Sequence, residues 1–260
     1  MSASLTHIDT ACALLEFGGW RLLTDPVFDP PGGRYWFGWG TSSRKLAHPA
    51  IEAGAIGPVD AVLLSHHQHG DNLDRAGRTV AEAAPLVLST RAGASQFARG
   101  VGLRVGETHR LSAPDRADLL VTASPARHRP AWIPAFAAGP TIGFRLESEA
   151  LVRGPVYITG DTTLTDAVRD AVRGHGIDVL VVHVGAVRFP RITGPARYTM
   201  DAREAAELAT LADPRLVVAV HTSGWTHFRE GPDELRAAFV AAGLGERLVV
   251  PVPGTPIDLE

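Results

Sequence analysis

The sequence is poor in sulfur and has no long hydrophobic run. Its 260 residues include two methionines and a single cysteine, Cys12. A lone thiol cannot form an internal disulfide, and its place in the apolar segment 11–15 predicts a buried, unreactive side chain. No segment approaches the roughly 20 apolar residues of a membrane-spanning helix, and the N-terminal residues lack the basic head and apolar run of a signal peptide. We therefore expect a cytoplasmic protein without an integral membrane segment.

The chain also lacks an excess of charge of either sign. The 25 Lys and Arg nearly balance the 28 Asp and Glu, so no overall field attracts nucleic acid or an anionic membrane. At 45% hydrophobic residues the chain can bury a sizeable core, which excludes a disordered protein. No internal repeat or linker-like segment divides it, so we expect one domain over residues 1–260. A small-molecule substrate is the expected partner, and self-association stays open.

Short apolar runs separated by turn residues predict a fold rich in strands. The runs 11–17 and 20–24 flank Gly18-Gly19, a pattern typical of a hairpin. Further runs predict strands at 59–65, 86–89, 118–124, 141–146, 156–159, 177–184 and 216–220. Helical spacing and capping residues predict helices at 71–84, 93–98, 163–174, 200–211 and 232–242. This order favours sheets with helices on the outside.

One segment is rich in aromatic residues but has no period. Residues 29–40 hold two prolines, four glycines and the side chains of Tyr35, Trp36, Phe37 and Trp39. Such a composition predicts a loop, which either covers the edge of the core or forms a wall of a substrate pocket.

Histidine is the residue that the sequence places with a pattern. Of eleven histidines, three lie with an aspartate in the segment 66–71, directly after the predicted strand 59–65. Imidazole and carboxylate groups are costly to bury unless something coordinates them, and they are the ligands that a divalent ion such as zinc takes. In an extended turn alternate residues point the same way, so His67, His69 and Asp71 could converge on one ion.

Three further candidate ligands follow other predicted strands. His128 comes shortly after the strand ending at Ser124, and His221 directly follows the strand 216–220. Asp161 follows the strand 156–159, and Gly160 permits the sharp backbone turn that would direct it inward. Strand ends are rigid positions from which a sheet protein can build a metal site. His183 lies inside a strand beside this site, and Trp225 and His227 follow His221 closely enough to line a pocket.

The order His-x-His-x-Asp, His, Gly-Asp, His resembles that of the metallo-β-lactamase superfamily. Further motifs resemble the branch of ascorbate-phosphate lactonases and N-acylphosphatidylethanolamine-hydrolysing phospholipases D: Asp25-Pro26, Ser65 before the histidine cluster, the segment 125–128 and the segment 157–161. The resemblance covers roughly residues 11–228. It implies an α/β fold, an αββα sandwich of two mixed β-sheets flanked by helices, with the metal site along one edge.

By position, the resemblance also implies the ligands of one or two divalent ions, zinc first and manganese as an alternative. The first ion would be held by three histidines, namely His67 or His66, His69 and His128. The second would be held by Asp71 and His221, with Asp161 bridging the two ions.

The sequence departs from this family pattern at two places. Asn72 stands where the family usually has a histidine, which weakens the second site unless His66 or His67 replaces the missing ligand. The branch often carries a histidine before the helix predicted at 200–211, where this chain has Tyr198 and Thr199. These departures support an alternative reading, a relative that binds metal in a regulatory role without turnover.

The leading interpretation is a hydrolase that opens a lactone, amide or phosphodiester bond by attack of a metal-activated water. Asp71 or Asp161 would orient that water and accept its proton. No Gly-x-Ser-x-Gly motif offers a serine nucleophile instead. Four arginines near the expected rim could hold an anionic substrate: Arg127, Arg129, Arg188 and Arg191. A second enzymatic interpretation is an amidohydrolase barrel. The two early hairpin strands and the Val-His at residues 220–221 argue against it.

Overall fold

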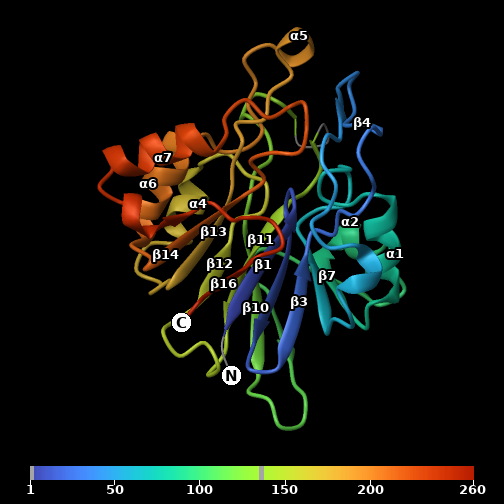
Figure 1. Ribbon diagram of the computed structural model, residues 1–260, viewed down its shortest axis with the longest axis vertical. Coiled ribbons are helices and arrows are strands. Elements are labelled where there is room, and N and C mark those ends of the chain that lie inside the picture. The colour runs from blue at the N-terminus through green and yellow to red at the C-terminus, as the bar shows by residue number, and fades with distance from the viewer. Residues whose placement is uncertain (1–2, 135–137) are drawn as a thin grey trace.

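The structure is a computed structural model that describes residues 3–134 and 138–260 (Figure 1). Within these ranges the strands form two seven-stranded sheets and a separate two-stranded one. The first sheet contains, in spatial order, β16 (Pro256–Asp258), β1 (Ser4–Asp9), β2 (Cys12–Phe17), β3 (Trp20–Thr24), β6 (Ala61–Leu64), β7 (Val87–Thr90) and β8 (Gly100–Leu103). The second contains β15 (Leu248–Val249), β14 (Leu216–Val220), β13 (Val179–His183), β12 (Val156–Ile158), β11 (Ile142–Glu147), β10 (Leu119–Pro125) and β9 (Thr108–Leu111).

The main core lies between the two sheets. Strand residues of alternating position meet there, among them Leu15 and Leu63 from the first sheet and Phe144 and Val181 from the second, and all four are almost fully buried. Alternation places every second side chain on the same face of a strand, so each sheet contributes one apolar face to this layer. Burial of these two faces holds the sheets together as a sandwich.

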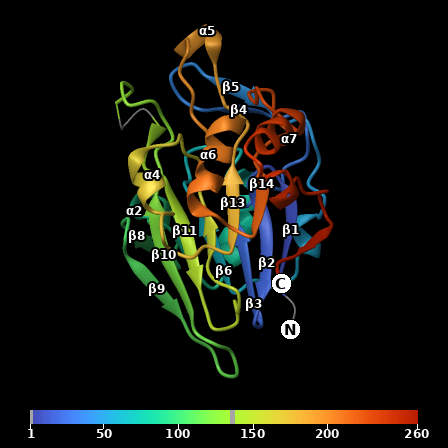
Figure 2. The ribbon, with the colours of Figure 1, turned by 90° about the vertical axis from the view of Figure 1, so that its left-hand side faces the viewer.

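Helices cover the outer faces of both sheets. α4 (Asp166–Asp170), α6 (Ala202–Ala212) and α7 (Pro232–Ala241) bury apolar side chains against the second sheet, and Figure 2 shows α4 and α6 lying over it. α1 (Arg75–Ala83) and α2 (Arg91–Ala94) lie on the first sheet, on the other side of the molecule in Figure 1. The expected αββα sandwich is confirmed, and the alternative of an amidohydrolase barrel is wrong.

All of the predicted strands form, each with its ends shifted by at most a few residues. The prediction missed five strands at the ends of the two sheets: β1, β8, β9, β15 and β16. These segments are short or carry polar and glycine residues, as in Ser4–Asp9 and Thr108–Leu111, so they lack an apolar run. Cys12 is buried in β2, as expected.

Helix starts are the least accurate part of the prediction. The helix expected from residue 71 begins at Arg75, because the Asp74 side chain accepts a hydrogen bond from Gly77 N and caps it there. The helix expected from residue 200 begins after Asp201, which accepts from Glu204 N in the same way. The segment 71–74 is therefore free to belong to a loop instead of a helix.

The aromatic segment is only partly a loop. Within it β4 (Arg34–Trp36) pairs antiparallel with β5 (Ser42–Arg44), so the prediction of a loop without strands is wrong for these residues. In Figure 1, β4 and α5 (Pro190–Thr193) project beyond the sheets at the end opposite the two chain termini. Within the described part of the chain, no helix is long and apolar enough to cross a membrane.

The strand directions bring the carboxyl ends of the strands that precede the candidate ligands to the edge from which β4 and α5 project. β3 and β6 run parallel, as do β12, β13 and β14. β10 is antiparallel to β11, which is itself antiparallel to β12, so β10 points the same way as β12. The loops that follow these strands hold the histidines and aspartates singled out in the sequence.

Candidate metal centre

Three buried histidines from two sheets form the first side-chain cluster. His66 and His69 follow β6 of the first sheet, and His128 follows β10 of the second. His66 Nε2 lies 2.8 Å from His69 Nδ1, and His128 Nε2 lies 3.1 Å from that same atom. Three imidazole nitrogens converging at one buried point are the donor set that a zinc-like ion takes.

The structure selects His66 over His67 for this cluster. The backbone after β6 does not run as an extended turn, because Leu73 N and Asn72 N both donate to the carbonyl oxygen of His69. In this tight loop residues three apart, His66 and His69, face each other, and the half-buried His67 lies outside the cluster. The expectation that His67 converges with His69 and Asp71 is therefore wrong.

A second buried cluster consists of Asp71, His221 and His227. Asp71 Oδ2 lies 3.3 Å from His221 Nε2 and 3.1 Å from His227 Nε2. Asp161 lies between the two clusters, since its Oδ2 is 3.4 Å from His221 Nε2 and 3.8 Å from His128 Nε2. The sequence had indicated every member of the two clusters except His227, which it offered only as a residue lining a pocket.

His227, and not residue 72, joins Asp71 and His221 in the second cluster. Asn72 is fully buried, and its Nδ2 lies 3.5 Å from Ser65 Oγ instead of facing Asp71. The second cluster is thus complete without a histidine at position 72. A signal for His227 exists in the sequence, namely a second histidine in the loop that His221 opens.

Hydrogen bonds to the outer ring nitrogens fix how two of the histidines point. His128 Nδ1 donates to the carbonyl oxygen of Tyr198 at 2.8 Å, and His221 Nδ1 donates to that of Val184 at 3.1 Å. Because a carbonyl oxygen only accepts, each ring carries a proton on Nδ1 and directs its Nε2 toward the centre. This is the arrangement by which proteins orient imidazoles toward a metal.

The loop backbone positions the two remaining strand-end ligands. Gly160 has a φ of +59°, and a Cβ there would lie 2.5 Å from the carbonyl oxygen of Ile142, so only glycine permits the turn that directs Asp161 inward. His221 has a φ of +61°, and its amide donates to the carbonyl oxygen of Thr10 at 2.7 Å. The hydrogen bond holds this strained residue at the end of β14.

Asp25 and His183 form a buried pair beside the metal centre. Asp25 Oδ1 accepts from Ser65 N at 2.7 Å, and Asp25 Oδ2 lies 3.6 Å from His183 Nε2. Both side chains are almost completely buried, and His183 N donates to Thr159 Oγ1 beside Gly160. This pair ties the start of the β6 loop to β13, which favours the reading of His183 as a supporting residue.

Burial and mutual proximity shift the pKa values of these groups strongly. Burial, together with His128, lowers the pKa of His69 to about 3. Burial alone would raise the pKa of Asp161, but the surrounding histidines, His221 first, lower it to about 2. Burial opposes a raised pKa at His221, yet the carboxylates of Asp161 and Asp71 raise it to about 9.

The residues fit a cation better than they fit one another. Among the described residues, no hydrogen-bond donor reaches either carboxylate oxygen of Asp161 or Oδ1 of Asp71, although all three atoms are buried. An ionised carboxylate buried without a partner is far more costly than a neutral polar group, so buried charges in proteins are paired or coordinate a metal. One or two divalent ions between the clusters would satisfy the Asp161 oxygens and would bind the imidazole nitrogens that face them.

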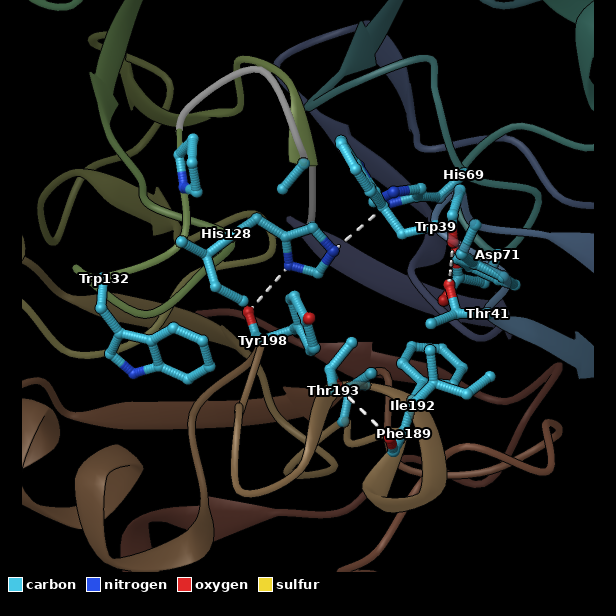
Figure 3. Close-up of a pocket in the computed structure, with 16 residues that line it drawn as sticks. Trp39, Thr41, His69, Asp71, His128, Trp132, Phe189, Ile192, Thr193 and Tyr198 are labelled. Atoms are coloured by element: carbon cyan, nitrogen blue, oxygen red, sulfur yellow. Dashed lines mark hydrogen bonds between the residues drawn. The ribbon is translucent and has the colours of Figure 1, made fainter.

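A cavity of about 410 Å³ opens directly onto the centre. His69, Asp71 and His128 reach it, and Figure 3 shows His128 between Trp132 and His69 in that view, with Tyr198 beside it. Residues 37–39 of the aromatic segment also line it, so that segment forms a wall of this pocket. The lining, as far as the structure describes it, contains none of the four arginines expected at the rim.

Comparison with known proteins assigns the chain to a family. Residues 20–222 match the family model described as the beta-lactamase superfamily domain, and the chain belongs to this family. This agrees with the superfamily resemblance seen in the sequence.

Relatives and solved structures extend the likeness over most of the chain. A protein of Anaeromyxobacter dehalogenans named UPF0173 metal-dependent hydrolase is 30% identical, over 83% of this chain and 76% of its own length. One of the same name from Caldivirga maquilingensis is 25% identical, over 94% and 93%. The fold is shared with an isothiocyanate hydrolase from Delia radicum gut bacteria (TM-score 0.78, 19% identity, 98% of each chain). It is also shared with Igni18, a metallo hydrolase from Ignicoccus hospitalis (TM-score 0.73, 21% identity, 100% and 99%).

Proposed function

We propose that this protein is a metal-dependent hydrolase that cleaves a small molecule with a metal-activated water. The observation that carries the proposal is the pair of buried clusters joined by Asp161 at the end of a substrate-sized cavity. Ligand cavities of about 300–1,000 Å³ are typical of small-molecule sites. The names of the relatives, metal-dependent hydrolases, support the same class.

The two clusters assign a role to each side chain. His66, His69 and His128 would hold the first ion, which we propose to be zinc, with manganese as the alternative. Asp71, His221 and His227 would hold the second, and Asp161 would contact both. His227 supplies the ligand that Asn72 does not, so two ions can bind despite the departure from the family pattern.

When bound, a divalent ion lowers the pKa of its water to about 7 and polarises the oxygen of the bond to be cleaved. Asp71 is the better placed of the two carboxylates to handle the proton, because it lines the cavity. Its Oδ2 faces His221 and His227, which leaves Oδ1 to accept a proton from the attacking water and return it to the leaving group. Asp161 is fully buried and would hold the ions in place.

The bond that is cleaved is a lactone, amide or phosphodiester bond in this proposal. The sequence motifs shared with ascorbate-phosphate lactonases and phospholipases D support the first and third of these.

Metal analysis combined with hydrolysis assays tests the proposal. We expect purified protein to bind up to two zinc ions per chain, and His66→Gln and His69→Gln to lower that number. His67→Gln is the matched control, since His67 lies in the same loop but outside the cluster and its loss should leave the metal content unchanged.

Turnover separates the hydrolase from the regulatory alternative. Chelation should abolish hydrolysis of a lactone, amide or phosphodiester substrate, and zinc or manganese should restore it. Tyr198, which stands where the branch often has a histidine, is the feature that favours the non-catalytic reading. Full metal content without turnover on any of the three substrate classes would establish that reading instead.

A further inference from the structure

We propose that the substrate carries an uncharged alkyl or aryl group beside the bond that is cleaved, and that the cavity wall selects for it. The inference rests on the proposed function, because the metal centre defines which end of the cavity holds the reacting bond. Beyond the proposed function, it assigns a chemical class to the part of the substrate that lies away from the metal.

The cavity divides into a polar end and an apolar body. His69, Asp71 and His128 form the polar end at the metal centre. The other lining side chains are mostly apolar or aromatic: Phe37, Trp39, Trp132, Ile133, Pro134, Ala138, Val187, Phe189 and Ile192. A substrate group in this body is removed from water by apolar walls, which favours a hydrocarbon group by about 25 cal/mol per Å².

The described lining offers no lysine or arginine that could pair with an anionic group. Arg129, the arginine nearest in sequence to Trp132, donates to the carbonyl oxygens of Pro130 and Ile133. Arg191, next to Ile192, is exposed and is not among the lining residues. A carboxylate or phosphate in the body of the cavity would therefore lose its hydration without gaining a charged partner. This excludes a substrate that is anionic far from its reacting bond.

The apolar walls come from three separate segments that meet above the centre. The aromatic segment contributes Trp39, the loop after β10 contributes Trp132, and α5 contributes Ile192. These three side chains stay 66%, 66% and 52% exposed, and Figure 3 shows them around the cavity. Large apolar side chains gathered around a pocket mouth, instead of being buried in a core, mark a surface that an apolar ligand covers.

A series of hydroxamates on the zinc-loaded protein tests the inference without requiring turnover. The hydroxamate group binds the metal and the tail enters the cavity, so calorimetry can compare acetohydroxamate, butanohydroxamate, hexanohydroxamate and octanohydroxamate. We expect the affinity to rise by up to about fourfold per added methylene until the cavity is filled. Suberic acid monohydroxamate, whose tail ends in a carboxylate, should bind no better than acetohydroxamate.

A charge added to the wall should reverse this preference. Ile192→Arg places a cation at the mouth, so we expect it to lower the octanohydroxamate affinity at least tenfold relative to suberic acid monohydroxamate. Val152→Arg is the matched control, because Val152 is 80% exposed and does not line this cavity. It should leave the ratio of the two affinities as in the wild type.

The outcomes separate the two proposals. Zinc-loaded protein that binds acetohydroxamate with an affinity that does not change with tail length would overturn the apolar class and leave the metal hydrolase standing. Equal or tighter binding of suberic acid monohydroxamate than of octanohydroxamate would also overturn it. Protein that binds no zinc, or binds zinc but no hydroxamate, would contradict the proposed function and with it the inference.

Discussion

Two residues, Asn72 and His227, set the second cluster apart from the family pattern in the proposed site. Asn72 is packed against Ser65 in a fully buried position, and His227 reaches Asp71 from the loop after β14. In the proposed site, His227 from the loop after β14 takes the place of a donor from the loop after β6. The number of donors is kept, but a different segment holds the ion. The site therefore depends on the fold as a whole, because these loops belong to different sheets.

If His227 and not residue 72 binds the second ion, substitutions at the two positions should have different effects. His227→Gln should weaken binding of the second zinc ion about tenfold or more, since it removes a ligand, and leave the first in place. Asn72→His should not add to the metal content, and overpacking of its buried position should destabilise the protein by about 1–3 kcal/mol. Zinc titration followed by elemental analysis measures the first effect, and denaturant unfolding the second. A variant Asn72→His that binds more zinc than the wild type would contradict this assignment.

His7 lies outside the metal centre and makes stability depend on pH. Burial lowers the pKa of His7 below its usual value of 6.5, and His7 Nε2 lies 2.9 Å from the carbonyl oxygen of Thr10. As the pH drops below about 6.5, the unfolded chain binds a proton at His7 while the folded chain does not. The free energy of unfolding therefore falls with pH in this range.

Replacing this side chain should flatten that dependence. Between about pH 7.5 and pH 5, we expect the melting temperature of His7→Gln to fall by less than that of the wild type. Scanning calorimetry at both pH values measures the difference, with His48→Gln as the control at an exposed histidine. An unchanged pH dependence in His7→Gln would show that His7 does not contribute.

At the scale of elements, a buried ion pair holds the aromatic segment in place. Lys45, directly after β5, is almost fully buried, and its Nζ lies 2.6 Å from Asp9 Oδ2 and 3.5 Å from Asp74 Oδ2. Asp9 ends β1, and Asp74 caps α1. The hairpin that carries the cavity wall is thereby fastened to a strand and to a helix start.

Breaking this pair should destabilise the protein and loosen the wall. Lys45→Met leaves two buried carboxylates without their cation, which costs about 3–5 kcal/mol in comparable cases. Urea unfolding measures the loss, and Arg44→Met, at an exposed neighbour, is the control. A loss in Lys45→Met no larger than that in Arg44→Met would contradict the anchoring role.

For the molecule as a whole, the proposed ions would join the two sheets. His66, His69 and Asp71 follow a strand of the first sheet, and the other ligands follow strands of the second. A ligand that binds only the folded state stabilises it by about 4 kcal/mol at a thousandfold excess over its dissociation constant. Metal binding should thus stabilise the whole sandwich against unfolding, because its ligands come from both sheets.

Metal removal should therefore lower the melting temperature markedly. In a protein of this size 4 kcal/mol corresponds to roughly 10 °C, so zinc-buffered samples should melt progressively later as free zinc rises. Calorimetry over a series of free zinc concentrations measures the shift, with magnesium, a poor match for imidazole, as the control. A melting temperature that is independent of zinc would contradict the metal centre.

From the sequence, the apolar runs predicted sheets with helices outside, the family resemblance implied the sandwich, and the motifs indicated most members of the two clusters. Apolar runs fix the strands of the core, because burial on both faces of a strand leaves a local signature. Residues close after a strand start from a fixed point, so the order of His128, Asp161 and His221 after three strands could identify them together as candidates.

The tertiary structure decided what depends on loop geometry and on contacts between distant segments. The loop after β6 brought His66, and not His67, to His69, because the direction of each side chain follows the backbone path of the loop, which no spacing rule encodes. The loop after β14 brought His227 to Asp71. The apolar body of the cavity formed only when three separate segments met, because each segment on its own is an ordinary surface loop.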